Sequence, residues 1–336
     1  MGISDIARTV ERRINATGVR RKAAQGWRPA VTGFHGYGSP TRLHVLGRVL
    51  MESPDPASNQ VQRGWRQFFT TQVSDIPVSV RIGDLVVESR TNAQGYIDVL
   101  VHDHGLTPGW HEVSLEPADG PATSARILIV DSDVRYGIIS DIDDTVLVTW
   151  LPRALIAAWN AWVKRTDQRR PVPGMAEFYA ELRRNHPNMP VFYLSTGAWN
   201  TFGTLVDFLA RHNFPTGPLL LTDWGPTPTG LFRDGAEHKK IQLRNLIIEY
   251  PDIHWILIGD DGQHDPLTYS ELVFEHPDRV AGVAIRQLSP QEHVLAHGTA
   301  APLAQARREE LFGVRTIVGE DGHELLEEYR KDPFLG

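Results

Sequence analysis

The stretch that decides the fold is Tyr-Gly-Ile-Ile-Ser-Asp-Ile-Asp-Asp-Thr-Val, residues 136–146. It begins as a short apolar run, which is typical of a buried strand. Three carboxylates and a threonine then follow within five residues. In an open α/β sheet the chemistry lies just beyond the carboxyl ends of the strands. The stretch therefore predicts a strand that presents two acids, Asp141 and Asp143, at that edge of a sheet.

Two acids in this position are suited to phosphate chemistry in two ways. A hard cation such as Mg²⁺ prefers oxygen ligands and keeps waters that a phosphate can replace. An aspartate can also act as a nucleophile and carry a covalent phosphoryl group. The stretch alone does not choose between these roles.

Downstream of residue 146, short apolar runs alternate with segments of helical periodicity. This alternation is typical of a parallel, doubly wound α/β sheet. The expected strands are 190–194, 219–221, 255–258 and 280–285, and the expected helices are 174–184, 204–212 and 239–250.

Three further polar motifs fall at the ends of these predicted elements. Ser195-Thr196-Gly197 follows one buried strand, and Lys239-Lys240 opens a helix. Gly259-Asp260-Asp261-Gly262-Gln263-His264-Asp265 follows another apolar strand. Each motif lies in the structural context that its chemistry needs, which makes the set more specific than any member.

The four motifs, in this order, resemble those of the haloacid-dehalogenase (HAD) superfamily of phosphohydrolases. Residues 136 to about 290 are similar to the catalytic domain of App1-type phosphatidate phosphatases, as is the Glu237-His238-Lys239 sequence. The resemblance implies a HAD-like, Rossmann-like fold and a Mg²⁺ cofactor. It implies that Asp141 is the nucleophile and a metal ligand, and that Asp143 is the general acid and base.

The resemblance also implies roles for the remaining motif residues. Asp143 would give its main-chain carbonyl to the metal, and Thr145 would orient the loop. The hydroxyl and main-chain N–H groups of Ser195, Thr196 and Gly197 would hold phosphate oxygens. Lys239 would hold the nucleophile and the phosphate, and Asp260 and Asp265 would complete the metal site.

Some assignments stay open at the level of sequence. Lys239 and Lys240 both lie near the apolar stripe of their helix, so spacing cannot choose between them, whereas the resemblance favours Lys239. Asp261 is the alternative to Asp265 as the second acid of the last motif. We expect Asp144 to be a capping or solvated acid, because acids are common near helix starts.

The chain before the catalytic motifs has a different pattern. Residues 31–132 show period-two alternation with turn signals, which favours an all-β, sandwich-like domain. Residues 1–30 predict a basic amphipathic helical segment, with a helix over 4–16. Residues 133–300 would form the HAD-like domain, and residues 301–336 a charged, locally helical tail.

Composition excludes several classes of protein. The formal net charge of −7 argues against a nucleic-acid partner. The absence of cysteine excludes disulfides, thiolate catalysis and Cys-ligated zinc. No run reaches the ~20 apolar residues of a membrane span, and we see no secretory signal. We expect a cytoplasmic protein, with peripheral membrane association as the alternative.

Two segments are compatible with a lipid substrate. Residues 1–28 carry seven basic residues against two acidic ones, and a basic amphipathic helix can lie on an anionic membrane. We favour packing on the protein itself, because the apolar face is small. Residues 147–173 form an insert with Trp159 and Trp162 on one predicted helix face. In this superfamily such inserts cover the active site, but core packing is again the favoured interpretation.

The sequence thus predicts a Mg²⁺-dependent phosphatase that forms an aspartyl-phosphate, with phosphatidate hydrolysis to diacylglycerol as the function implied by the resemblance. One alternative is a HAD phosphatase for a soluble sugar or nucleotide phosphate. Another is a non-enzymatic docking protein that senses phosphate. The protein partners and the role of the β domain are not determined by the sequence.

Overall fold

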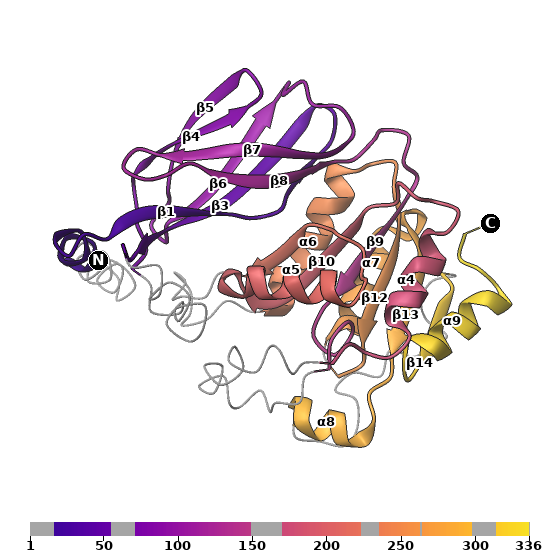
Figure 1. Cartoon of the computed structure of the whole chain (residues 1–336). Helices are drawn as coiled ribbons and strands as arrows, with labels where there is room; N and C mark the ends of the chain where they lie inside the picture. The colour runs from indigo at the N-terminus through magenta and orange to yellow at the C-terminus, as the bar shows by residue number, and fades with distance from the viewer. Residues whose placement is uncertain are drawn as a thin grey trace, which may run out of the picture. The chain divides into compact units, whose positions relative to one another are not determined.

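The computed structural model describes residues 17–54, 71–148, 170–222, 235–262, 264–297 and 314–335. The chain divides into two compact units, with the division between Ser132 and Asp133 (Figure 1). Each unit has its own sheet. Within the described residues, no helix is long and apolar enough to cross a membrane.

The first unit is built around an eight-stranded sheet whose pairings are antiparallel except between β2 and β8. Strand β3 is central to the pairing, because it bonds to β1, β2 and β6. The strands are β1 (Arg28–Gly33), β2 (Gly36–Gly38), β3 (Arg42–Glu52), β4 (Pro77–Ile82), β5 (Leu85–Arg90), β6 (Tyr96–His102), β7 (Gly109–Pro117) and β8 (Thr123–Ile129).

The period-two pattern of the sequence explains this sheet. Along β3, buried residues alternate with half-buried ones, so one face of the strand packs in the core. Leu43, Val45 and Val49 of that face join Val80 of β4 in a single apolar cluster. The hydrogen bonds describe one continuous sheet, and the predicted two-sheet sandwich packing stays a prediction.

The start of the chain differs from the expected helical segment. The helix predicted over 4–16 lies outside the described residues. A helix spans 17–24, but β1 already begins at Arg28 and pairs with β3. Strand β1 has no clear alternating pattern in the sequence, because only Val31 among its residues is buried.

The second unit confirms the predicted parallel α/β architecture. Its six strands run in the order β11-β10-β9-β12-β13-β14, and every neighbouring pair is parallel. They are β9 (Tyr136–Asp141), β10 (Val191–Ala198), β11 (Leu219–Thr222), β12 (His254–Asp260), β13 (Val280–Arg286) and β14 (Thr316–Gly319).

Helices cover both faces of this sheet (Figure 1). Consecutive residues of a strand point to opposite faces. Ser140 meets Tyr179 of α4, whereas its neighbour Asp141 meets Lys239 of α6, so these helices lie on opposite faces. The described helices are α4 (Met175–Arg183), α5 (Phe202–Arg211), α6 (Gly235–Glu249), α7 (Asp265–Glu275), α8 (Pro290–His297) and α9 (Gly322–Lys331), with short 3₁₀ turns at Trp199–Thr201 and Pro277–Arg279.

The strand order reverses between β9 and β12. From β9 the chain moves outward through β10 and β11, and it then returns to place β12 on the other side of β9. Ligands of open α/β sheets bind at such a switch point, beyond the carboxyl ends of the strands. This is where Asp141 and Asp260 end their strands.

The prediction of a charged, locally helical tail over 301–336 is confirmed for the helix, which is α9, but the described C-terminal residues belong to the second unit. Strand β14 pairs with β13 and extends the sheet, and α9 lies beside α4 (Figure 1). Gly174 and Gly322 allow the two helix starts to touch, because a Cβ on Gly322 would lie 2.2 Å from the carbonyl carbon of Gly174. The charges of α9 face solvent while Leu325 and Tyr329 are buried, and sequence reasoning gave too much weight to those charges.

Other bounds differ from the predictions by a few residues. Helix α6 begins at Gly235 rather than Lys239, so the lysine lies one turn inside it. Strand β10 runs on to Ala198 and contains Ser195-Thr196-Gly197 instead of ending before it. Most of the predicted insert over 147–173 lies outside the described residues, which stop at 148 and resume at 170.

Candidate active site

Asp141 is the last residue of β9, and a buried polar chain fixes its backbone. The hydroxyl of Ser140 donates to the carbonyl oxygen of Asp141 at 2.7 Å. The Tyr179 hydroxyl in turn donates to Ser140, because the serine has only one hydrogen to give. Burial raises the pKa of Tyr179, which keeps it a neutral donor. Tyr179 lies in the helix predicted over 174–184, but it was not predicted as a site residue.

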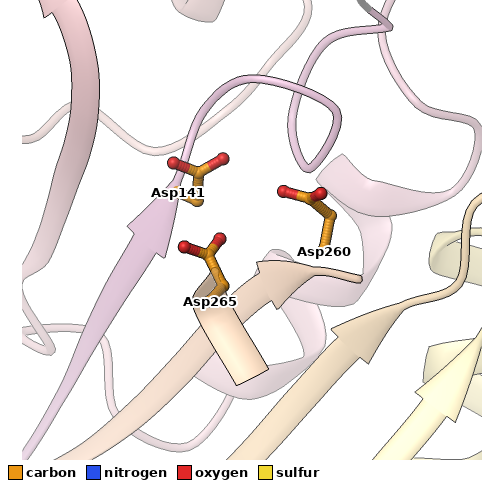
Figure 2. Close-up of side chains that lie close together, drawn as sticks. All are labelled: Asp141, Asp260 and Asp265. Atoms are coloured by element: carbon orange, nitrogen blue, oxygen red, sulfur yellow. The ribbon is translucent and has the colours of Figure 1, made fainter. Parts of the chain in front are cut away.

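Three carboxylates converge at the carboxyl ends of β9 and β12. Asp141 comes from β9, Asp260 from β12 and Asp265 from the first residue of α7, and their side chains point toward one another (Figure 2). One oxygen from each lies within 4.8 Å of the others. All three residues are almost fully buried. The structure thus brings together the three acids that were predicted to bind the metal through their side chains.

Lys239 bridges two of these acids. Its Nζ lies 2.6 Å from Asp141 Oδ1 and 2.5 Å from Asp265 Oδ1. Lys240, the alternative left open by the sequence, instead pairs with Glu271 Oε2 at the surface. A lysine one turn inside α6 can therefore reach the carboxyl ends of β9 and β12.

The pKa values reflect the crowding of like charges in a buried space. Burial raises the pKa of Asp141 well above its ordinary value; Lys239 opposes this shift, and the charge of Asp265 adds to it. Burial likewise raises the pKa of Asp260, with Asp265 and Asp141 adding. Burial alone would lower the pKa of Lys239, but the surrounding carboxylates outweigh it and raise that pKa. The cluster as a whole therefore needs additional positive charge to be fully ionised.

The charge and the oxygen ligands of the cluster suit a divalent cation. Lys239 engages only the Oδ1 atoms of Asp141 and Asp265, and the Oδ2 atom of each is buried with no hydrogen-bond partner. A buried carboxylate oxygen without a partner is costly. With all three acids ionised, one lysine leaves two negative charges, which a dication would neutralise. All the available donors are oxygens, as Mg²⁺ prefers.

Asp143 lies beside the cluster rather than within it. Its carboxylate is half-buried, unlike those of Asp141 and Asp260. The hydroxyl of Ser195 donates to Asp143 Oδ2 at 2.9 Å, and the same hydroxyl oxygen accepts the N–H of Gly197 at 2.9 Å. The predicted phosphate-binding hydroxyl is therefore bonded to the predicted proton-transfer residue.

The segment Ser195-Thr196-Gly197 is held in an irregular part of β10. Its register with β11 shifts between Leu194 and Ala198. The hydroxyl of Thr222, the last residue of β11, donates to the carbonyl oxygen of Thr196 at 2.8 Å. This contact fixes the segment while it departs from the regular ladder. Sequence reasoning did not identify Thr222, although it follows a short apolar strand as the motifs do.

Thr145 and the acids next to the cluster have separate partners. Thr145 Oγ1 faces Asp260 Oδ2 at 3.5 Å, and the N–H of Gly262 donates to Asp260 Oδ1 at 2.8 Å. Asp261 is directed away, toward the N–H of Leu288 and the ring of His293. The structure thus places Asp265, and not Asp261, with the other acids.

Asp144 corrects the expectation of a solvated acid. It is buried, and its backbone has a positive φ of 60°. Its main-chain oxygen accepts a hydrogen bond from Arg286, the last residue of β13. Sequence reasoning missed Arg286, although a charged residue that ends an apolar strand is the same signal that marks Asp141 and Asp260.

The fold and the site together define a class of domain. It is a parallel α/β domain with a buried triad of acids and one lysine at its switch point, an arrangement suited to a divalent cation and phosphate. Residues 136–287 match the family model described as "Phosphatidate phosphatase APP1, catalytic domain". The match bears out the resemblance drawn from the four motifs: residues 136–287 are similar to the catalytic domain of App1-type phosphatidate phosphatases.

Two curated relatives each match a little under half of the chain. Phosphatidate phosphatase APP1 of Saccharomyces cerevisiae is 27% identical over 156 residues, which is 46% of this chain and 26% of the yeast protein. An uncharacterized protein of Schizosaccharomyces pombe is 26% identical over 152 residues, 45% of this chain and 25% of that protein. The chain therefore spans about a quarter of the length of these relatives.

Among solved structures, the HAD domain of the effector protein Lem4 from Legionella pneumophila is similar at 15% identity. The similarity covers 46% of this chain and 87% of that chain, with a TM-score of 0.31. A likeness of this degree carries no argument about function.

Proposed function

We propose that this protein is a Mg²⁺-dependent phosphohydrolase of phosphate monoesters that acts through an aspartyl-phosphate on Asp141. The observation that carries the proposal is the pairing at Lys239. The lysine shares the Oδ1 atoms of Asp141 and Asp265, and the buried Oδ2 atoms of both acids are left without a protein partner. Such a site has one cation of its own and capacity for a second.

In the first step, a carboxylate oxygen of Asp141 attacks phosphorus, and the bond from phosphorus to the alcohol oxygen breaks. Asp143 gives its proton to the leaving alkoxide. Asp143 is suited to this role because it is half-buried and bonded to Ser195, and so lies at the margin of the cluster. Lys239 holds the nucleophile and balances part of the charge. A carboxyl group must be protonated to act as an acid here.

In the second step, water attacks the phosphorus of the aspartyl-phosphate and Asp143 accepts the proton of that water. The bond from phosphorus to the carboxylate oxygen of Asp141 breaks, which releases phosphate and restores the free carboxylate. Ser195, Thr196 and Gly197 supply hydroxyl and N–H donors to the phosphate oxygens, and Thr145 supports Asp260. Mg²⁺, held by Asp141, Asp260, Asp265 and the main chain of Asp143, would supply the positive charge that phosphoryl transfer requires.

The HAD-like assignment of the fold belongs to this proposal. Its support is the parallel sheet, the reversal of strand order at β9 and β12, and the order of the motifs along the chain. Phosphatidate, with diacylglycerol as product, is the substrate we propose, because the matched family model and the yeast relative carry that name. A cytoplasmic location with access to a membrane surface is the corresponding proposal for the cell.

The test is a screen of phosphate monoesters with the purified full chain. It includes an aryl phosphate, sugar and nucleotide phosphates, and phosphatidate in vesicles, each with Mg²⁺ and with a chelator. We expect Mg²⁺-dependent release of phosphate and the highest kcat/KM for phosphatidate. A preference for sugar or nucleotide phosphates would favour the alternative phosphatase, and no release from any ester would favour the sensor. Binding to phosphatidate vesicles, measured separately, distinguishes a lipid phosphatase from a phosphatase of sugar or nucleotide phosphates.

A further inference from the structure

Arg286 joins three segments of the chain at the carboxyl end of β13. Its side chain is buried, with the residue 5% exposed. Nη1 donates to the main-chain oxygen of Asp144 at 2.7 Å, and Nε donates to the main-chain oxygen of Glu320 at 3.0 Å. Nη2 donates to Glu292 Oε1 at 2.6 Å. Every nitrogen of the guanidinium group thus has a fixed partner.

Arg286 contacts the main chain of Asp144, the residue that directly follows the proposed proton donor, Asp143. Asp144 has a φ of 60°, a conformation that residues other than glycine rarely adopt. Its own N–H donates to the main-chain oxygen of Leu147 at 2.8 Å, and the N–H groups of Val146 and Leu147 both donate to Ile142. Residues 142–147 therefore form a closed turn, and the Arg286 bond anchors its main chain to the sheet.

Arg286 is itself held in place. Glu292 accepts its bond through Oε1 and accepts the N–H of Ser289 through Oε2, at 2.9 Å. The carboxylate thereby balances the guanidinium charge and fixes the start of α8. Strained main-chain conformations persist where the surroundings over-determine them, and they cluster at functional sites. Arg286 is itself held by three hydrogen bonds, so its bond to the main chain of Asp144 restrains the left-handed conformation of that residue.

We propose that Arg286 is a positioning residue for the reaction, because it holds the left-handed turn at Asp144 and thereby sets where the carboxyl group of Asp143 lies. This inference rests on the proposed function, since it assigns Arg286 to the proton transfer in the first step. Arg286 touches no reacting atom in this scheme. It acts through the main chain between Asp143 and Leu147.

The experiment compares Arg286→Met with a control variant in which an arginine at the opposite end of β13 is replaced. Arg279, just before β13, also donates to three main-chain oxygens, those of Tyr250, Pro251 and Ile253, but at the amino end of the strand. Arg279→Met removes the same number of guanidinium hydrogen bonds, from a half-buried position, without touching the turn. Arg286→Lys keeps the charge but cannot reproduce the fixed fork of donors, and it gives the same comparison if Arg286→Met does not fold.

The readout is the first turnover of an alkyl phosphate and of an activated aryl phosphate, measured by rapid quench as release of each alcohol. Misplacing a catalytic group by about 1 Å can cost about 10²-fold. We expect a loss of that order for the alkyl ester in Arg286→Met, and a loss smaller by at least about tenfold for the aryl ester, whose phenolate needs little protonation. Arg279→Met should leave the ratio of the two rates unchanged.

A second readout does not depend on activity. Amide hydrogen exchange over residues 142–148 should accelerate in both Arg286 variants and stay as in the wild type in Arg279→Met. Equal slowing of both esters, or unchanged exchange in this turn, would overturn the inference. Failure of the wild type to hydrolyse any phosphate ester would instead refute the proposed function, and the exchange comparison would still decide whether Arg286 holds the turn.

Discussion

Ser195 donates a hydrogen bond of 2.9 Å to the carboxylate of Asp143, and this bond links the end of β10 to the turn that follows β9. The same serine oxygen accepts the N–H of Gly197. Two of the groups that we propose as phosphate ligands, the Ser195 hydroxyl and the Gly197 N–H, are therefore bonded to protein atoms. A phosphate that accepted hydrogen bonds from these two groups would replace the bonds that they make here.

Replacement of the proposed nucleophile should abolish turnover. An amide is neither a competent nucleophile nor a good ligand for Mg²⁺, so Asp141→Asn should release no phosphate. The variant should stay folded, because the amide oxygen can still accept the bond from Lys239. Circular dichroism and phosphate release, measured on one preparation, check both parts. Near-wild-type activity would exclude the aspartyl-phosphate mechanism.

Removal of Asp260 should raise the requirement for metal. Asp260→Ala deletes one of the three carboxylates of the cluster, so we expect activity to need more Mg²⁺ or to vanish. The measurement is a Mg²⁺ titration of phosphate release for the wild type and the variant. Asp261→Ala serves as the control, because Asp261 is directed toward Leu288 and not toward the cluster. Full wild-type activity in chelator would refute the metal assignment.

The role of Asp143 as general acid can be tested by comparing esters with good and poor leaving groups. Asp143→Asn should slow an alkyl phosphate by about 10²–10⁴-fold, the usual contribution of general acid catalysis, and an activated aryl phosphate by less. Because the same residue activates water in the second step, the comparison needs a rapid-quench burst for the aryl ester and single turnover for the alkyl ester. Equal slowing of phosphoenzyme formation would restrict Asp143 to metal binding or positioning.

Replacement of Lys239 should lower activity far more than replacement of Lys240. Lys239→Met removes the only ammonium seen between Asp141 and Asp265 within the described residues, so we expect activity to fall by at least about 10²-fold, as for loss of one preorganised electrostatic contact. Lys240→Met removes a partly exposed pair with Glu271, which should change activity little. Comparable losses in kcat for both variants would contradict the assignment of Lys239.

Glu292 should stabilise the fold in a pH-dependent way. Burial would raise its pKa, but hydrogen bonds from Arg286 and Ser289 outweigh burial and lower the pKa below the ordinary 4.5. A lowered carboxyl pKa gives stability that is present above about 4.5 and is lost as the pH falls through the folded-state pKa. Glu292→Gln should therefore be less stable than the wild type at pH 7, and the gap should narrow below about pH 4.5.

Urea denaturation at several pH values measures this gap. Glu327→Gln, at an exposed position of α9, is the control and should differ little from the wild type at any pH. A gap between Glu292→Gln and the wild type that widened on acidification would contradict the assignment.

The acids of the site could be located from sequence for a simple physical reason. Asp141 and Asp260 each end a strongly apolar run, and buried parallel strands place such residues at a common edge. Asp265 required the family resemblance, because its place depends on how a turn leads into α7. The choice of Lys239 over Lys240 depended on the same resemblance, since both lie near the apolar side of α6.

The features that were not predicted from the sequence depend on contacts between segments that are distant in the chain. Arg286 and Asp144 are far apart in the chain, and nothing local to either predicts that a guanidinium meets a main-chain oxygen. The integration of β14 and α9 was hidden for a related reason. Strand β14 is only four residues long and alternates half-buried with buried positions, which is too short a pattern to distinguish from a loop.

The order of strands in the parallel sheet has a consequence for synthesis of the protein. Strand β9 obtains one neighbour, β10, early, but its other neighbour, β12, is encoded only at His254–Asp260. At ribosomal rates of about 5–20 residues per second, this leaves one edge of β9 unpaired for on the order of ten seconds. During that interval a nascent chain exposes a highly apolar strand edge, which can pair with another chain. The strand that bears the proposed nucleophile is therefore open to pairing with another chain until β12 has been made.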